Sequence, residues 1–434
     1  MESRLGWHRA LEAAKQFDTW VLCDGDERHQ KSLEGWATGI PGLTFRCVPR
    51  SKFELRFWDS PGCLYYLYNR WHRRAFRVAK ELHRTIQFDL THQVNFCGFR
   101  EPGYLHQLDV PFVWGPLGGT QNFPLQFLSE TSLIDGMYEF FRGLLNTYDL
   151  RISARVRRAA CKASVVLSAN TTCQRDLKAA LGCETTVHLE TGLREIPGRT
   201  KPHRKQGEPL NILWAGRLKA WKAFPLLMQS LEGLPPDVDY RVRVLGYGVC
   251  KSRWMKQAKK LGIADHIEWV GWPPYAESLV HYRWADVFAF TSLRDTSGTG
   301  LLEALSFGVP IVGLNHQGAA DIITSNSGMM IDPTSKASIC RGFTHALETL
   351  YRDPDHLEVL SKGALTRAES YHWDRLGESM AAVYARVVFA ESVSEELDAT
   401  VELTDITNRE FSIQPNPIQN TSPISCSSHT HSDS

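Results

Sequence analysis

Length, composition and charge together exclude several classes of protein. The chain has 434 residues, 43% of them hydrophobic, which is enough for two domains with cores of their own. Its 49 Lys and Arg residues balance 48 Asp and Glu residues, and a net charge of +1 argues against a nucleic-acid-binding protein. The ten cysteines lack a Cys-x-x-Cys pair and any zinc-like Cys/His spacing, and no run of about 18 apolar residues is present. We therefore expect a cytoplasmic protein with reduced thiols and no metal site.

The first half of the chain is predicted to alternate helices and strands. Apolar residues at helical spacing predict a helix over 5–17. Short apolar runs predict strands at 19–23, 88–92, 111–114, 164–168 and 185–188. The acidic segment 24–26 follows the first of these strands, and we interpret it as an ordinary loop rather than a metal-binding Asp-x-Asp motif.

Two segments of this half, 61–86 and 151–162, are predicted to be basic amphipathic helices. In the first, apolar residues fall on one face and Arg and Lys cover much of the rest, and the second is similarly basic. A helix packed on a core with a solvated basic face explains the pattern. The alternative is contact with an anionic membrane or a lipid-linked acceptor, which would place the protein peripherally on the inner face of the plasma membrane.

Candidate ligand groups follow two of the predicted strands. His92 lies at the carboxyl end of strand 88–92, and Gly118 and Gly119 follow strand 111–114. Open α/β sheets bind ligands at the carboxyl ends of their strands, and glycines allow close approach of the backbone. A histidine at a strand end can equally be structural, and paired glycines can form a plain tight turn, so both interpretations stay open here.

A second series of strands and helices follows a linker. Residues 197–209 are rich in Pro, Gly, Lys and Arg, which is typical of a linker. The next strand, 211–215, leads to Arg217 and then to a helix predicted to begin at Lys222. Because a helix start is electrostatically unfavourable for cations, Arg217 and Lys222 favour an anionic ligand over two unrelated surface charges.

The stretch 286–314 predicts a strand, a loop of small polar residues at 297–300, a helix and a second strand. A glycine-rich loop that leads into a helix N-terminus is an anion site, because free N–H groups point outward and the helix dipole favours negative charge. Glu303 lies in the first turns of this helix among apolar residues. We therefore expect its carboxylate to face the loop and hold a ligand.

The spacing of the acids in this stretch resembles a known family. Asp295 and Glu303 are separated by seven residues, and with Ser292, Gly300, the triplet 302–304 and the triplet 308–310 they resemble glycosyltransferase family 4, the retaining nucleotide-sugar transferases. Asp295 stands where the family usually has Glu. The string Trp-Gly-Pro-Leu-Gly-Gly at 114–119, with Gly-Phe-Arg at 98–100, resembles a bacterial subgroup of the family.

The resemblance covers about residues 5–389 and implies an α/β fold of the GT-B type, with two facing Rossmann-like domains and a deep inter-domain cleft. We expect an N-terminal, acceptor-side domain over 1–196, the linker 197–209, a donor domain over 210–371, and a helix over 372–390 that crosses back to the first domain. The polar composition of 391–434 predicts a disordered tail. The family's first strand and glycine-rich loop are missing ahead of the first helix, so either the start is misplaced or the N-terminal domain lacks that strand.

The implied function is retaining transfer of a sugar from a nucleotide diphosphate sugar to a hydroxyl of a glycan or a lipid-linked acceptor, a hexosyltransferase-type activity (EC 2.4) in polysaccharide biosynthesis. No cofactor or metal is implied beyond the nucleotide-sugar co-substrate. Asp295 would stabilise positive charge at the anomeric carbon, and His92 would contact the transferred sugar or the acceptor; these are the predicted catalytic residues. Predicted donor-binding residues are Arg217, Lys222, Glu303, Ser297, Gly298, Thr299, Gly300, Leu301, Gly246 and Trp272, and predicted acceptor-side residues are Gly118 and Gly119.

The roles behind these predictions differ. Arg217 and Lys222 would clamp the diphosphate, Glu303 would accept hydrogen bonds from the ribose, and Trp272 would either stack on the base or cap its strand. Two alternatives remain at this point. One is a nucleotide-sugar epimerase of the same architecture, which would turn over donor without an acceptor. The other is a non-catalytic sugar-nucleotide-binding protein, which would bind donor without transfer.

Overall fold

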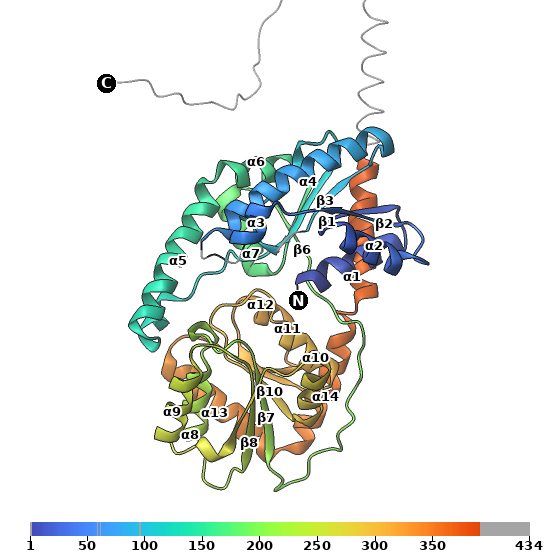
Figure 1. Ribbon diagram of the computed structural model, residues 1–434. Helices are drawn as coiled ribbons and strands as arrows, with labels where there is room; N and C mark the ends of the chain where they lie inside the picture. The colour runs from blue at the N-terminus through green and yellow to red at the C-terminus, as the bar shows by residue number, and fades with distance from the viewer. Residues whose placement is uncertain (1, 59, 61, 95–96, 391–434) are drawn as a thin grey trace, which may run out of the picture. The chain divides into compact units, whose positions relative to one another are not determined.

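The structure is a computed structural model of the chain that describes residues 2–58, 60, 62–94 and 97–390. The described residues up to Val388 form one compact unit. Two sets of parallel strands, each covered by helices, make up this unit, so the α/β prediction is confirmed (Figure 1). The predicted tail, 391–434, lies outside the described residues.

The first set of strands forms two sheets. Strands β1 (Thr19–Asp24) and β2 (Leu43–Val48) pair in parallel, and β3 (Thr91–Gln93), β4 (Phe112–Leu117), β5 (Val165–Ser168) and β6 (Thr186–Val187) form a four-stranded parallel sheet. Within the part of the chain that the structure describes, no strand joins the two sheets. The helices of this half are α1 (Glu2–Ala14), α2 (Glu27–Ala37), α3 (Lys52–Phe57), α4 (Leu64–Ile86), α5 (Leu133–Ile152), α6 (Ala154–Lys162) and α7 (Thr171–Leu181).

Two predicted boundaries in this half are wrong, for local reasons. The strand expected at 88–92 begins only at Thr91, because Gln87 ends α4 in the left-handed conformation (φ 55°) and the Phe88 N–H is bound by His83 Nδ1. The basic segment 151–162 is not one helix. Ser153 separates α5 from α6, and its hydroxyl accepts a hydrogen bond from the Val156 N–H as the N-cap of α6.

The second set of strands forms one six-stranded parallel sheet. Its members are β7 (Leu210–Ala215), β8 (Tyr240–Leu245), β9 (Ile267–Gly271), β10 (Val287–Phe290), β11 (Ile311–Leu314) and β12 (Gly328–Ile331). They lie in the order β12-β11-β10-β7-β8-β9, so the direction of winding reverses between β7 and β10. This order is that of a dinucleotide-binding sheet, and it creates a crevice at the carboxyl ends of β7 and β10.

Helices cover both faces of this sheet (Figure 1). They are α8 (Phe224–Glu232), α9 (Lys251–Lys260), α10 (Tyr275–Trp284), α11 (Thr299–Ser306), α12 (Gln317–Ile322), α13 (Lys336–Arg352) and α14 (Pro354–Glu369). The prediction that a helix begins at Lys222 is wrong: Lys222 ends the 3-10 turn Ala220–Lys222, and α8 follows Ala223. Ala223 is left-handed (φ 49°), a conformation that costs alanine more than glycine.

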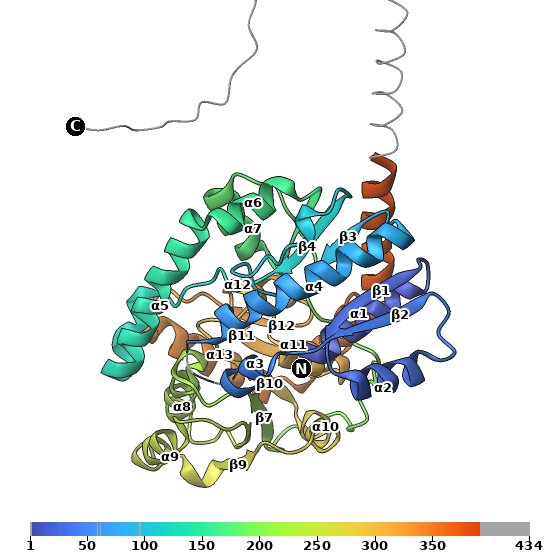
Figure 2. The ribbon, with the colours of Figure 1, turned by 45° about the horizontal axis from the view of Figure 1, so that its top comes forward.

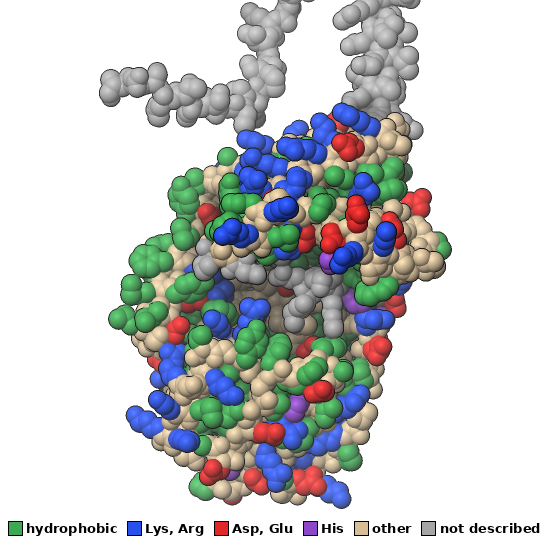
Figure 3. All heavy atoms as spheres, in the orientation of Figure 1, with side chains coloured by type: hydrophobic (Ala, Val, Ile, Leu, Met, Phe, Trp, Pro, Cys, Tyr) green, Lys and Arg blue, Asp and Glu red, His purple; other side chains and the backbone are tan. Residues whose placement is uncertain are grey.

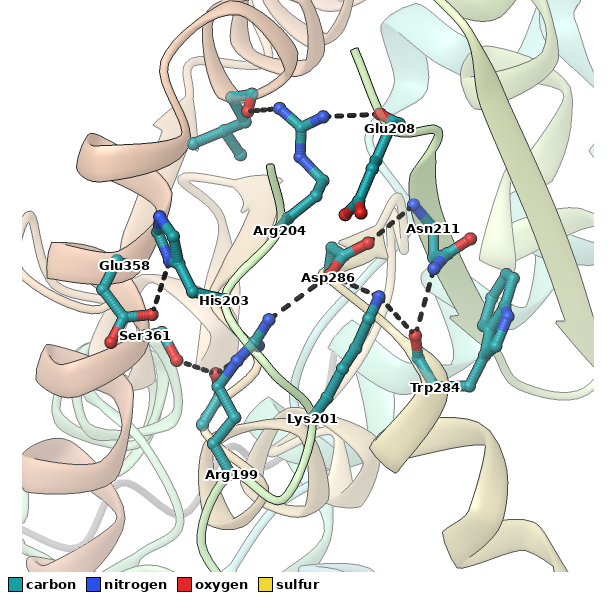
Figure 4. Close-up of polar contacts among 12 residues, drawn as sticks. Arg199, Lys201, His203, Arg204, Glu208, Asn211, Trp284, Asp286, Glu358 and Ser361 are labelled. Atoms are coloured by element: carbon teal, nitrogen blue, oxygen red, sulfur yellow. Dashed lines mark hydrogen bonds and ion pairs between the residues drawn. The ribbon is translucent and has the colours of Figure 1, made fainter. Parts of the chain in front are cut away.

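Residues 197–209 contain no helix or strand, yet they are held firmly against the sheet (Figure 4). The fully buried carboxylate of Asp286 accepts hydrogen bonds from Lys201 Nζ at 2.6 Å and Arg199 at 3.3 Å, as well as from the Asn211 N–H. The buried guanidinium of Arg204 donates to the carbonyls of Leu350 and Tyr351 at the end of α13. The basic residues of this predicted linker supply these contacts.

Residues 373–388 form a helix that packs on the four-stranded sheet of the first half. Met380, Val383 and Tyr384 are buried against Val113 and Leu167, which lie on β4 and β5. Among the described residues, no helix has both the length and the apolar content needed to cross a membrane.

On the other side of the molecule, α5 and the turn before it join the two halves. Phe123 and Phe127 enter the hydrophobic core of the second sheet. Glu139 of α5, which is buried, accepts two hydrogen bonds of 3.0 Å from the guanidinium of Arg294. This fork of two parallel hydrogen bonds is the geometry in which arginine binds a carboxylate most strongly.

We predict that Glu139→Ala lowers the free energy of unfolding by about 3 kcal/mol, because Arg294 is left largely buried with its charge unpaired. Urea unfolding of the full chain measures the change. Glu81→Ala is the matched control, since Glu81 is exposed on α4, and it should shift stability by less than about 0.5 kcal/mol. Equal stabilities for the two variants would contradict this role for Glu139.

Candidate active site

The candidate site lies where the winding of the second sheet reverses. The chain that leaves β7 carries Arg217 and Lys222, and the chain that leaves β10 carries Asp295 and leads into α11. Parallel strands deliver the loops that follow them to one edge of the sheet, so Lys222 and Asp295 meet there although they are 73 positions apart. The predicted cleft is confirmed: Figure 3 shows the surface hollowed between the two halves.

Asp295 is fixed by three contacts. The Oδ2 atom of Asp295 forms a short ion pair with Lys222 Nζ. The backbone N–H of Asp295 donates to Gln317 Oε1 at 2.8 Å, and the Oδ1 atom of Asp295 accepts from the Thr296 N–H at 3.2 Å. Lys222 and Asp295 are both mostly buried. The predicted sugar-side carboxylate and phosphate-side cation thus neutralise each other in this structure.

Arg217 differs from Lys222 in its surroundings. Its side chain is exposed, and it forms no ion pair with another described residue. An exposed guanidinium beside a half-buried Lys–Asp pair provides the positive charge that an entering anion would meet first.

Glu303 of α11 is partly buried and is held by α10; that its carboxylate faces the loop and holds a ligand stays a prediction. Its Oε2 accepts a hydrogen bond of 2.6 Å from the hydroxyl of Tyr282, a buried residue of α10. Burial raises the pKa of Tyr282 well above its usual value, and the nearby Glu303 carboxylate adds to the shift. Tyr282 therefore stays protonated and holds one oxygen of Glu303, which directs the carboxylate.

The predicted loop residues fall into two groups. Gly298 is left-handed (φ 62°) and leads directly into Thr299 and Gly300, the first residues of α11, so the positive end of this helix faces the loop. Leu301 is fully buried in the core, so only its backbone lies near the loop. Ser297 is also buried, and its hydroxyl donates to a residue of the first half.

The first half contacts this loop through the carboxyl ends of its own strands. A Cβ on Gly118, after β4, would lie 2.6 Å from the Thr296 side chain, so only glycine fits there. Asn170 Nδ2, after β5, donates to the Thr296 carbonyl at 2.6 Å. Gly119 is left-handed (φ 79°) with open space where a Cβ would be. Figure 1 shows α11 and α12 on the side of the second sheet that faces the first half.

Trp272 lies at the exposed rim of the site. It makes an edge contact with Tyr247 at 5.5 Å between ring centroids, and both rings are more than half exposed at the carboxyl ends of β9 and β8. Tyr247 was not among the predicted residues, although its position after β8 gave the same signal as that of Trp272. Gly246 has a packing role: a Cβ there would lie 2.0 Å from the Gly216 carbonyl.

His92 is bound on both sides of its ring. Nε2 lies 2.7 Å from the Gly115 carbonyl, so it carries the hydrogen and donates, and Nδ1 accepts from the Tyr384 hydroxyl at 2.6 Å. Burial lowers the pKa of His92 to about 3, with Arg9 contributing, so the ring is neutral. Its contact with the sugar or acceptor stays a prediction, and it would require one of these two hydrogen bonds to be exchanged.

The acidic segment after β1 has ordinary partners. Asp26 caps α2 by accepting hydrogen bonds from the N–H groups of Arg28 and His29 at 3.0 Å, and Asp24 pairs with Arg50. Among the residues described, no three His, Cys, Asp or Glu side chains are grouped as metal ligands. Metal independence nevertheless stays a prediction.

Glu190 is a site residue that the sequence analysis missed. It follows β6, and its Oε1 accepts the hydrogen bond of 2.5 Å from Ser297. Its Oε2 is buried and has no hydrogen-bond partner among the described residues. Burial raises the pKa of Glu190 to about 7; the bond from Ser297 opposes the shift and the nearby Asp295 adds to it. Its position after a strand of the first half was the available signal.

We predict that Glu190→Gln reduces the loss of stability as the pH rises. Glutamate in the unfolded chain loses its proton near pH 4.5, whereas folded Glu190 keeps it until about pH 7. The stability contributed by protonated Glu190 is therefore fully present below pH 4.5 and is lost as the pH rises to about 7, by at most about 1.4 kcal/mol per pH unit.

The measurement is urea unfolding between these two pH values, with the variant compared to the unaltered chain. Glutamine stays neutral, so the variant should lose less stability over the interval. Glu195→Gln, an exposed residue of the same segment, is the control and should follow the unaltered chain. Parallel curves for all three proteins would show that Glu190 does not hold a proton in this range.

Sequence comparison identifies relatives of the second half. Residues 198–365 match the glycosyl transferases group 1 family. A D-inositol 3-phosphate glycosyltransferase of Streptomyces bingchenggensis is 29% identical over 218 residues, which cover 46% of this chain and 46% of that protein. The chain therefore spans about half the length of the curated relatives that it matches.

Structural comparison covers both halves. A HepE structure from Anabaena, in complex with UDP, has a TM-score of 0.59 at 16% identity, over 88% of this chain and 96% of that one. Sucrose-phosphate synthase from Thermosynechococcus elongatus has a TM-score of 0.62 at 14% identity, over 89% and 92% of the two chains. These likenesses confirm the GT-B fold, and the match to the glycosyl transferases group 1 family lies within it, over residues 198–365.

Proposed function

We propose that the protein is a retaining glycosyltransferase that moves a hexose from a nucleotide diphosphate sugar to a hydroxyl of a glycan or a lipid-linked acceptor. The observation that carries the proposal is the group formed by Arg217, Lys222, Asp295 and the N-terminus of α11 where the sheet reverses. Cations and a helix dipole there suit a diphosphate, and the adjacent carboxylate suits the sugar attached to it.

In the proposed reaction, cleavage of the bond between sugar and phosphate places negative charge on the leaving diphosphate. Arg217 and Lys222 stabilise that charge, and the dipole of α11 acts in the same direction. Entry of the donor phosphate draws Lys222 into contact with two negative groups, because it already pairs with Asp295. Asp295 then lies beside the anomeric carbon, where its charge stabilises the positive charge that develops.

A separate set of side chains would bind the nucleoside end of the donor. Glu303, held by Tyr282, accepts hydrogen bonds from the ribose hydroxyls, and Trp272 with Tyr247 forms an aromatic rim for the base. Because HepE structures contain UDP and glucose, a uridine diphosphate hexose is the first donor class to test. Gly118 and Gly119 border the acceptor side, where Gly118 allows close approach to residue 296.

The two rival functions are separated by one assay with a labelled donor. An epimerase would convert the donor sugar without any acceptor, and a binding protein would bind donor without transferring its sugar. The proposed cytoplasmic location and the contact of the basic helices with an anionic membrane or a lipid-linked acceptor are not needed for this assay.

We predict that Arg217→Ala lowers kcat/KM by an amount equivalent to about 2–5 kcal/mol of transition-state stabilisation, because it removes a charge that the leaving diphosphate needs. Lys222→Ala should have a similar or slightly smaller effect. Steady-state kinetics and donor affinity of the full chain measure both. Arg241→Ala is the control, since Arg241 is exposed at the amino end of β8, away from the loop edge. If both site variants stay within about threefold of the unaltered chain, the diphosphate assignment fails.

We also expect glycosyl transfer to persist in excess EDTA, because Arg217, Lys222 and the α11 dipole already supply positive charge where the diphosphate leaves. Initial rates with and without EDTA test this expectation. Asp24→Ala combined with Asp26→Ala should leave the rate unchanged. Loss of activity in EDTA that Mn²⁺ restores would instead require a metal in the reaction.

A further inference from the structure

Helix α5 buries a polar side and exposes an apolar side, which is the reverse of an ordinary surface helix. Its buried side carries two polar residues: Glu139, which binds Arg294, and Asn146, which donates to the Thr120 carbonyl at 2.6 Å and accepts from Arg100 at 2.5 Å. Its exposed side carries large apolar residues at spacings of three and four: Ile134, Tyr138, Phe141, Leu145, Tyr148 and Ile152. Amphipathic helices normally bury the apolar side, so this side requires a partner.

The exposed apolar surface is wide. Ile134 is 81% exposed and Leu145 is 62% exposed. Leu133, Met137, Phe140 and Leu144 are also exposed. Together with the six residues above, they fill an arc of roughly 160° around the helix axis at about 3.6 residues per turn. In Figures 1 and 2, α5 lies at the outer edge of the first half, and Figure 3 shows apolar side chains gathered there. We call this surface the α5 apolar face.

Basic residues adjoin the α5 apolar face. Exposed Arg151 lies near the end of α5, and Arg157 of α6, whose guanidinium donates to the Arg151 carbonyl, continues the positive surface with Arg158. Helix α6 contains no acidic residue. Helix α4 adds exposed Arg70, Arg73, Arg77, Lys80 and Arg84. Figure 3 shows Lys and Arg side chains gathered on the first half, next to the apolar side chains at its outer edge.

The start of α4 links the two surfaces. Arg100 donates to Asp149 of α5 at 2.7 Å and lies over the ring of Tyr65, which is exposed at the first turn of α4. Exposed Tyr66 follows, with Arg70 at 6.0 Å from its ring. Apolar side chains, tyrosines and cations in one continuous surface are the composition of a helix that lies in a membrane interface.

We propose that the α5 apolar face and the adjoining basic surface of α4 and α6 dock on an anionic lipid bilayer, with α5 lying in the plane of the interface. The apolar side chains enter the acyl boundary, and each Lys or Arg near the surface is attracted by anionic headgroups. This docking does not depend on glycosyl transfer, since none of its residues belongs to the candidate active site.

A second copy of the chain fits the surface less well. A two-fold interface brings the same patch of each copy together, so two basic surfaces would adjoin. The apolar arc is also wider than the seam of two residues in seven that a paired helix buries. The positive charge of the basic surface and the width of the apolar arc both favour a bilayer over a second copy of the chain.

The test is flotation of the full chain with vesicles of phosphatidylcholine, with or without about 30 mol% phosphatidylglycerol, in the absence of nucleotide sugar. We expect flotation with the anionic vesicles and much less with the neutral ones. Ile134→Gln combined with Leu145→Gln should lower the partition coefficient by about tenfold or more. Arg157→Gln combined with Arg158→Gln should lower it mainly at low salt.

The matched control replaces two exposed apolar residues of the second half, Val280→Gln and Val359→Gln, and should bind within about twofold of the unaltered chain. If the first α5 pair fails to fold, as circular dichroism would show, Phe141→Ser with Tyr148→Ser tests the same face. The proposal is overturned if the unaltered chain does not float or if both pairs of α5 variants float as it does. A dimer by light scattering that the α5 variants abolish would also overturn it, because the face would then be a protein interface.

Discussion

The arrangement depends on one constraint: the four-stranded and the six-stranded sheets are both parallel, and the carboxyl ends of both face residues 295–298. A parallel strand delivers the loop that follows it to that end of its sheet, whatever the sequence of the loop. Strands β4, β5 and β6 therefore present Gly118, Asn170 and Glu190 to the same short segment that β10 delivers from the other half. The loop is held by both halves, and its place fixes that of Asp295.

Charge at this loop is balanced within the protein. Lys222 neutralises Asp295, and Glu190, close to Asp295 and buried, keeps its proton to about pH 7. Two ionised carboxylates so close together would repel each other, and a proton on Glu190 removes that repulsion. Arg217 is an exposed cation of the site, so its charge is available to a diphosphate.

Most of the second half could be predicted from the sequence, because its signals are local. Strand β7 differs from its predicted limits, 211–215, by one residue. The resemblance assigned Lys222 and Asp295 to one donor site, but their direct ion pair was not predicted. The start of α8 could not be located because Ala223 adopts a left-handed conformation without the usual glycine, so the sequence contains no break signal there.

What could not be predicted depends on partners distant in the sequence. The contacts of the predicted linker 197–209 could not be predicted, because nothing in this basic stretch reveals that Asp286 is buried opposite its cations. Glu190 had no neighbouring motif, and its raised pKa comes from burial between the halves. Helix α5 could not be oriented from its apolar pattern, since that pattern marks the side that faces outward.

The orientation of α5 follows from two requirements on one helix. Glu139 and Asn146 hold the first half together and bind it to Arg294, so their side must face inward, and the apolar side is then left at the surface. Arg294 directly precedes Asp295. If α5 docks on a bilayer, the helix contacts lipid on one side and the neighbour of the sugar-side carboxylate on the other. The width of α5, roughly 10 Å, and the side chain of Arg294 would then separate Asp295 from the lipid, an arrangement that suits an acceptor anchored in the membrane.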